Sequence, residues 1–549
     1  MDNHRLDHAL RRCGAVLLVG LALTSSSLGV LAPQENVDRD AVNRIKKEAS
    51  EHSGLRDVLS YITDVIGARL TGSPGIQQAQ KWIVGKLGEY GLANPHLELW
   101  GPFGRGWSLE GFVSNMTKPG FNPLIAYPKA WSPSTQGAIR GEPIYLDAKD
   151  EAGLQLYRGK LRDRIVLIAP PREVIAHFEP DARRLSDEQL LRLANAAPSG
   201  QRFELSPEQR AAQELLAKKW RLVYSEGAAI ALQPGSGDGG TLWVTSATIP
   251  APIGTPYDRA PKPWAPDSGP VIPQAVVAVE QYNRIIRLLR EGVHVELEIE
   301  INSRFYSEPG SAGGLMEHNV IAELPGTDLK DEIVMIGGCL DSWHAGTGAT
   351  DNAAGAAICI EAMRVLKALD LHPRRTIRLG LWSGEEQGRL GSRAYVADHF
   401  ARRIEPVAGS SQVGTAPRFE MKPEYYKLSA YFDLDDGTGR IRGVYLRGNE
   451  AARPIFRSWL ADFKDLGAST LTSASFDLAD DFSFAEVGLP GFFFLRDEID
   501  YGRIAHTNMD VYDRIQEDDL RQAVAVVASF AYNAAVRDEK LPRPVLAAH

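Results

Sequence analysis

Four nearly continuous apolar runs in the second half of the chain limit the folds that are open to it. They read EIVMIGG (332–338), TIRLGLW (376–382), LSAYFDL (428–434) and LPGFFFL (489–495). Strands that are buried on both faces carry such runs, because helices cover both sides of their sheet. Helix-like segments such as NAAGAAICIEAMRVLKAL (352–369) alternate with the runs. The pattern predicts an α/β fold with a mixed, largely parallel sheet flanked by helices.

The stretch from residue 135 to 302 has a different pattern of apolar residues and turns, and it predicts an inserted β-rich domain. Short apolar runs and turns dominate it, and VHVELEIEI (293–301) alternates strictly, as a half-buried antiparallel strand does. A charged, helix-like insertion lies between residues 181 and 220. The 549 residues are enough for two domains. We therefore expect residues 33–134 and 303–549 to form the main domain around the inserted one.

The first 32 residues predict a secretory signal peptide. Arg5, Arg11 and Arg12 precede the apolar run GAVLLVGLAL (14–23), and small and polar residues follow it. A spanning helix needs about 20 apolar residues, so an uncleaved membrane anchor is the less favoured alternative. We expect an exported protein, with no stable membrane insertion after the signal is removed.

Net charge and cysteine content argue against a nucleic-acid-binding protein and against a protein stabilised by a disulfide framework. The net charge is −9, and no block of Lys and Arg is long enough to follow a phosphate backbone, so we expect no nucleic-acid partner. The three cysteines are too few for a disulfide framework. A large packed core must therefore stabilise the chain.

Side chains of the kinds that bind metals follow each of the four apolar runs. In open α/β sheets the carboxyl ends of the strands border the ligand crevice, so such side chains can meet although they are far apart in sequence. We therefore expect one site to be built from Cys339, Asp341, His344 and Asp351, from Glu385 and Glu386, from Asp435 and Asp436, and from His506.

A site with so many carboxylates needs a cation, because buried like charges repel. Carboxylate, imidazole and thiolate together suit zinc. Of two adjacent glutamates, one can bind metal while the other takes a proton from water. Each residue also has a simpler explanation: Asp351 as a helix N-cap, His506 as a loop histidine, and the glutamates as a solvated pair. The joint occurrence at four strand ends favours the metal site.

Four blocks of the sequence resemble, in order, the M28 family of zinc peptidases, which includes aminopeptidases and a plasma glutamate carboxypeptidase-like branch. The blocks are GGCLDSWHAGTGATDNAAG (337–355), LWSGEEQGRLGSRAYV (381–396), DLDDGTGRIRG (433–443) and HTNMDVYDRI (506–515). The resemblance covers the chain after the signal and implies the zinc exopeptidase fold. The β-rich block is similar to the protease-associated domain that some members insert.

The resemblance also implies a role for each matched residue. Asp351 would bridge two zinc ions, and Glu385 would be the general base. Glu386 and His506 would complete one metal site. Asp435 would serve the other.

One position departs from the family pattern. The remaining ligand of the family is a histidine, and Cys339 stands there in this chain. Asp341 would lie behind it as the carboxylate that orients the ligand. A thiolate binds zinc at about 2.3 Å, against about 2.0–2.1 Å for an imidazole nitrogen, which offsets part of its shorter reach. Either this thiolate holds the second zinc or that zinc is held poorly, with His344 as a less favoured substitute ligand.

The function implied by the resemblance is that of an exported zinc exopeptidase. It would be of the aminopeptidase or the carboxypeptidase/dipeptidase type and would hydrolyse terminal bonds of a peptide substrate with water activated by two zinc ions. Two alternatives stay open. One is a catalytically impaired, peptidase-fold binding protein, and the other is a glutaminyl-cyclase-like enzyme on the same fold.

Overall fold

The computed structural model describes residues 35–198, 206–252, 255, 259–307, 314–404 and 418–544. The predicted signal peptide lies outside the described residues. The chain divides into two compact units, Met1–Asn36 and Val37–His549, and the architecture below is that of the second. None of its described helices has the length and apolar character needed to cross a membrane.

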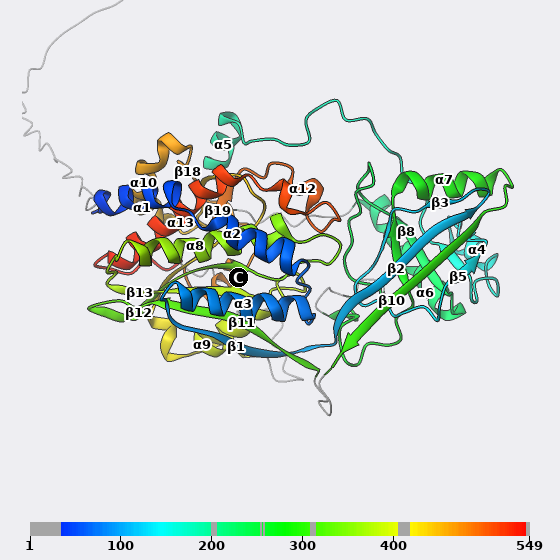
Figure 1. The fold of residues 1–549 in the computed structure, drawn as a ribbon, viewed down its shortest axis with the longest axis horizontal. Coiled ribbons are helices and arrows are strands. Elements are labelled where there is room, and N and C mark those ends of the chain that lie inside the picture. Colours follow the sequence, from blue (N-terminus) through cyan, green and yellow to red (C-terminus); the bar gives the residue numbers. More distant parts are fainter. Residues whose placement is uncertain are drawn as a thin grey trace, which may run out of the picture. The chain divides into compact units, whose positions relative to one another are not determined.

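The largest described sheet of this unit is a mixed sheet of eight strands (Figure 1). Its strands are, in spatial order, β1 (Ala93–Gly104), β11 (Leu315–Leu324), β13 (Arg375–Trp382), β12 (Leu329–Cys339), β16 (Leu428–Asp433), β19 (Gly491–Arg496), β17 (Ile441–Tyr445) and β18 (Thr470–Thr472). The strands β13, β12, β16 and β19 pair in parallel and correspond to the four apolar runs. The pairs β1–β11, β11–β13 and β17–β19 are antiparallel. The predicted fold class is confirmed.

Helices cover both faces of the sheet. One face carries a large apolar core to which six helices contribute: α1 (Arg39–Glu51), α2 (Leu55–Ser60), α3 (Pro74–Glu89), α8 (Ala354–Ala368), α10 (Arg453–Leu460) and α13 (Glu517–Val536). The opposite face packs against α9 (Leu390–His399) and α11 (Asp481–Ala485). The helix predicted over 352–369 is α8, which is almost wholly buried because apolar residues occupy most of its circumference.

Residues 106–306, called here the inserted part, contain two further sheets. One has five strands in the order β4 (Ala126–Pro128), β9 (Gln274–Val277), β8 (Ile230–Pro234), β7 (Ile165–Leu167) and β6 (Ile144–Tyr145). All its pairs except β4–β9 are parallel. The helices α4 (Glu151–Gln155) and α6 (Pro207–Glu226) lie between its strands in sequence, and α7 (Val279–Arg290) follows its last strand, β9. The inserted part therefore contains more helix than the pattern of short apolar runs and turns in its sequence indicates.

The second inserted sheet contains the strand predicted from VHVELEIEI. Its order is β3 (Asn122–Pro123), β2 (Gly106–Lys118), β10 (Glu296–Tyr306) and β5 (Ile139–Gly141). The strand β10 is antiparallel to β2 and β5, and its alternate residues Leu297, Ile299 and Ile301 are buried, as predicted. Because β2 precedes residue 135, this sheet draws on both sides of the expected boundary. The division into domains stays a prediction.

Candidate metal centre

The strand ends bring the expected side chains together. The strand β12 ends at Cys339, β13 ends three residues before Glu385, and β16 ends two residues before Asp435. His506 follows the short helix α12 (Tyr501–Ile504). Five of the expected ligand and base residues line one cavity of about 570 Å³: Asp351, Glu385, Glu386, Asp435 and His506. The expected convergence of the four clusters is confirmed.

Six side chains form two groups that could each hold a metal ion. Cys339, Glu385 and Asp435 make up the first, called here the thiol group. Asp351, Glu386 and His506 make up the second, called here the imidazole group. Within each group the potential ligand atoms lie within 4.8 Å of one another. Glu385, which the family resemblance assigns as the base, therefore also lies at ligand distance in the thiol group.

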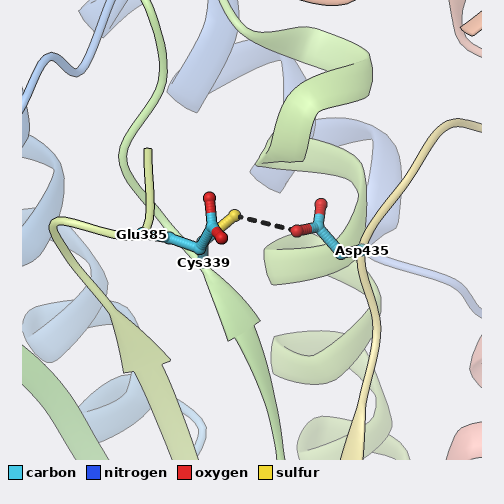
Figure 2. Close-up of side chains that lie close together, drawn as sticks. All are labelled: Cys339, Glu385 and Asp435. Atoms are coloured by element: carbon cyan, nitrogen blue, oxygen red, sulfur yellow. Dashed lines mark hydrogen bonds between the residues drawn. The ribbon is translucent and has the colours of Figure 1, made fainter. Parts of the chain in front are cut away.

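The thiol group is deeply enclosed. The Sγ atom of Cys339 donates to Oδ2 of Asp435 over 3.5 Å (Figure 2). Burial, followed by the charges of Asp435 and Glu385, raises the pKa of the Cys339 thiol. Burial, followed by the charges of Asp480 and Glu386, raises the pKa of Glu385. Without a cation, this pocket therefore favours protonated forms of its groups.

Two ion pairs of His506 bring the imidazole group together. The Nε2 atom of His506 lies 2.9 Å from Oδ2 of Asp351 and 3.1 Å from Oε2 of Glu386. Burial disfavours charge on the ring, but the two carboxylates outweigh burial and raise the pKa of His506 to about 11. A metal ion held by these three side chains would take the place of the proton on Nε2 of His506, because ligands bind metals in their deprotonated form.

The donor set fits zinc. Of the six side chains in the two groups, His506 alone is basic and the other five are acids. In addition, Oε1 of Glu386 is buried without a hydrogen-bond partner. Enclosed carboxylates, an imidazole and a thiol with an unsatisfied oxygen among them are suited to a cation, and this mixture of oxygen, nitrogen and sulfur donors is typical of zinc.

Asp341 holds the turn that carries the two glutamates. Its Oδ1 accepts a hydrogen bond from the backbone N–H of Glu385 at 3.1 Å. Its Oδ2 accepts from the N–H of Glu386 at 3.3 Å and from the hydroxyl of Thr71 at 2.8 Å. Two of these three bonds of Asp341 go to the turn, whereas the family resemblance implies that Asp341 orients residue 339.

His344 belongs to neither ligand group. Its Nε2 lies 2.8 Å from the carbonyl oxygen of Pro128, and the ring packs edge-on against Trp107 and Tyr127. Burial lowers its pKa to about 4, so the ring is neutral at physiological pH. This placement favours a packing role, in which His344 connects the region of the eight-stranded sheet to the inserted part.

Two residues that support the site were not singled out from the sequence. Asp510 accepts hydrogen bonds from the backbone N–H groups of Thr350 at 2.6 Å and Asp351 at 3.1 Å. The fully buried Arg69 donates to the carbonyl oxygens of Leu340 and Gly348, both at 2.8 Å. Asp510 lies in the block that begins at His506, so that block was the available signal. Arg69 stands in a loop with no distinguishing pattern.

The inserted part contacts the loop that carries His506. The backbone N–H of Val244 donates to the carbonyl of His506 at 2.9 Å, and the N–H of Leu242 donates to Oδ1 of Asn508 at 2.7 Å. The Trp243 ring lies 5.9 Å from the His506 ring, centroid to centroid. Trp243 also lines the metal cavity, so the insertion supplies part of its wall.

Comparison with known proteins agrees with this arrangement. Carboxypeptidase Q of Mus musculus is 30% identical over 277 residues, which are 50% of this chain and 53% of that protein. Carboxypeptidase Q of Homo sapiens is 28% identical over 277 residues, 50% of this chain and 52% of that protein. The chain thus matches about half the length of these curated relatives.

Two solved structures share the fold. The Peptidase M28 precursor from Shewanella amazonensis SB2B superposes with a TM-score of 0.63 at 24% identity, over 92% of this chain and 99% of that one. BSAP, a zinc aminopeptidase from Bacillus subtilis, superposes with a TM-score of 0.50 at 16% identity, over 88% and 95%. Residues 319–531, which contain both ligand groups, match the model of Peptidase family M28. Over these residues the chain therefore resembles peptidase family M28.

Proposed function

We propose that the protein is an exported, zinc-dependent exopeptidase that hydrolyses terminal bonds of short peptides. The observation that carries the proposal is the placement of two ligand groups on one cavity, at the carboxyl ends of β12, β13 and β16. The family match and the relatives named carboxypeptidase Q support peptide-bond hydrolysis. Export rests on the sequence of the first 32 residues.

Each residue of the two groups then has a role. Glu386, Asp351 and His506 would hold one zinc ion, and Cys339 and Asp435 would hold the other, with Asp351 between the two. Bound zinc supplies Lewis-acid polarisation of the scissile carbonyl and makes water acidic at neutral pH. Glu385 takes a proton from the attacking water and returns it to the leaving amine. Asp341 fixes the backbone of Glu385, so the base enters the cavity in a defined position.

One observation favours a second candidate, a peptidase-fold binding protein. Cys339 stands where the family has a histidine, and its buried thiol donates to Asp435. If the thiol keeps its proton in the presence of zinc, the second metal is not held and turnover is impaired. The cavity would then bind a peptide without cleaving it.

Hydrolysis of dipeptides separates the candidates. We expect the zinc-loaded protein to cleave at least one of Ala-Ala, Phe-Ala and Ala-Phe, with the products measured by chromatography. An N-terminal glutaminyl peptide serves as the parallel probe. Its cyclisation, without cleavage of any dipeptide, would assign the glutaminyl-cyclase alternative. Binding of dipeptides without any product would assign the binding protein.

A further inference from the structure

A second cavity opens beside the metal cavity. It has a volume of about 480 Å³, within the range of ligand-binding pockets. Asp436, Phe476 and Glu498 line both cavities, so the two meet at these residues. Asp436 directly follows the potential ligand Asp435. We call the second cavity the side chamber.

Three aromatic rings form one wall of the side chamber. The rings of Phe476 and Phe493 are stacked, with centroids 4.9 Å apart and planes at 13°. The Tyr445 ring lies 6.0 Å from Phe493 and 6.4 Å from Phe476. Tyr445 ends β17 and Phe493 belongs to β19, so the wall is fixed to the central sheet. Such a wall offers offset and edge-to-face contacts to a further ring.

A second part of the lining comes from the inserted part. Residues 183–196, called here the α5 segment, contain the helix α5 (Asp187–Ala194) and contribute Leu185 and Leu193 to the lining. This segment lies in sequence between β7 and β8 of the inserted sheet. In the structure α5 nevertheless contacts β18, at the edge of the eight-stranded sheet (Figure 1).

Ion pairs and backbone bonds anchor the α5 segment. The Nη1 atom of Arg184 lies 3.2 Å from Oδ2 of Asp497 and 2.6 Å from Oδ2 of Asp519. The backbone N–H of Arg183 donates to the carbonyl of Ile499 at 3.0 Å. Both carboxylates are buried, so these contacts fix the segment more firmly than exposed ion pairs do.

The charged residues of the side chamber are largely balanced. Arg192 pairs with Glu188 at 3.1 Å, and the buried Arg496 donates to the carbonyl of Gly439 at 3.1 Å. The acids Asp436 and Glu498 lie at the junction with the metal cavity. Because two acids and two arginines line the chamber, they give a charged ligand group no net attraction. The aromatic wall and the leucines favour an apolar ligand group.

We propose that the side chamber receives the side chain of the substrate residue at the scissile bond, and that the α5 segment makes this pocket selective for aromatic side chains. The proposal rests on the proposed exopeptidase function and names its substrate class. The guest ring packs between Phe476 and Phe493 on one side and Leu193 on the other. The inserted part thereby acts on specificity at a place distant from its own sheet.

The test compares two tryptophan substitutions on the same helix. Leu193→Trp fills the chamber, whereas Leu191→Trp is the matched control, since Leu191 is 64% exposed and does not line the chamber. We measure kcat/KM for Phe-Ala, Ala-Phe, Lys-Ala and Ala-Ala. For the native protein, kcat/KM for either Phe-Ala or Ala-Phe is expected to exceed kcat/KM for Ala-Ala by about 10-fold or more. Leu193→Trp is expected to lower this ratio by about 10-fold or more, and Leu191→Trp to leave it unchanged.

Three results would overturn the proposal: a native preference for Lys-Ala, no aromatic preference, or an unchanged ratio in a folded Leu193→Trp variant. If the native protein cleaves no dipeptide, the exopeptidase function fails separately. Calorimetric binding of the same dipeptides to the native protein and to both variants then tests the chamber on its own. Equal affinities for the phenylalanyl dipeptides and Ala-Ala would reject it.

Discussion

Replacing Glu385 by glutamine is expected to lower kcat by about 10²- to 10⁴-fold while leaving the zinc content unchanged. Glutamine has nearly the same shape as glutamate, but its amide cannot accept the proton of the attacking water. The backbone bond from residue 385 to Asp341 does not involve the replaced atoms. The turn should therefore keep its place, and the loss should be confined to proton transfer.

The matched control is the neighbouring substitution Glu386→Gln. Glu386 belongs to the imidazole group, so this variant should lose zinc, measured by elemental analysis of the dialysed protein. The comparison matters because Glu385 also lies within ligand distance of Cys339 and Asp435. Near-native turnover in Glu385→Gln would reject its role as base, and a loss of zinc would make it a ligand instead.

Removing the metal with a chelator is expected to abolish hydrolysis and to lower the free energy of unfolding. Without zinc, four enclosed carboxylates face one another with His506 as the single base in the two groups: Asp351, Glu385, Glu386 and Asp435. Binding to the folded chain alone stabilises it by about 4 kcal/mol when free zinc is roughly 1,000-fold above its dissociation constant. This gain disappears with the ion.

Urea unfolding with and without chelator measures the second effect, and added zinc should restore both activity and stability. The variant His506→Ala provides the control. It lacks one ligand of the imidazole group, so the chelator should change its stability less than that of the native protein. Equal activity and stability before and after chelation would contradict a resident metal.

The parallel strands of the eight-stranded sheet were predictable because they are buried on both faces. The runs at β12, β13, β16 and β19 are nearly uninterrupted, so no choice between faces is needed to recognise them. The convergence of Cys339, Glu385 and Asp435 then follows from the rule that ligands meet at the carboxyl ends of such strands.

Other features depend on contacts that no local pattern encodes. The strands β6, β7 and β8 have two to five residues, too few to show a period, so their parallel order was not predicted. The docking of the α5 segment depends on Arg184 and Asp497, which are 313 residues apart. Likewise, sequence spacing does not show that Asp341 binds the turn of Glu385 rather than residue 339.

The measurement that tests the account most directly is the zinc content per chain of the mature protein, purified reduced, alongside Cys339→Ser and Cys339→His. A two-metal hydrolase predicts close to two zinc ions in the native protein. Cys339→Ser should lose one of them and Cys339→His should retain both, because serine is a poor zinc ligand and histidine a good one. One zinc ion or none in the native protein, rising toward two in Cys339→His, would contradict the account and show that the second site was lost with the histidine.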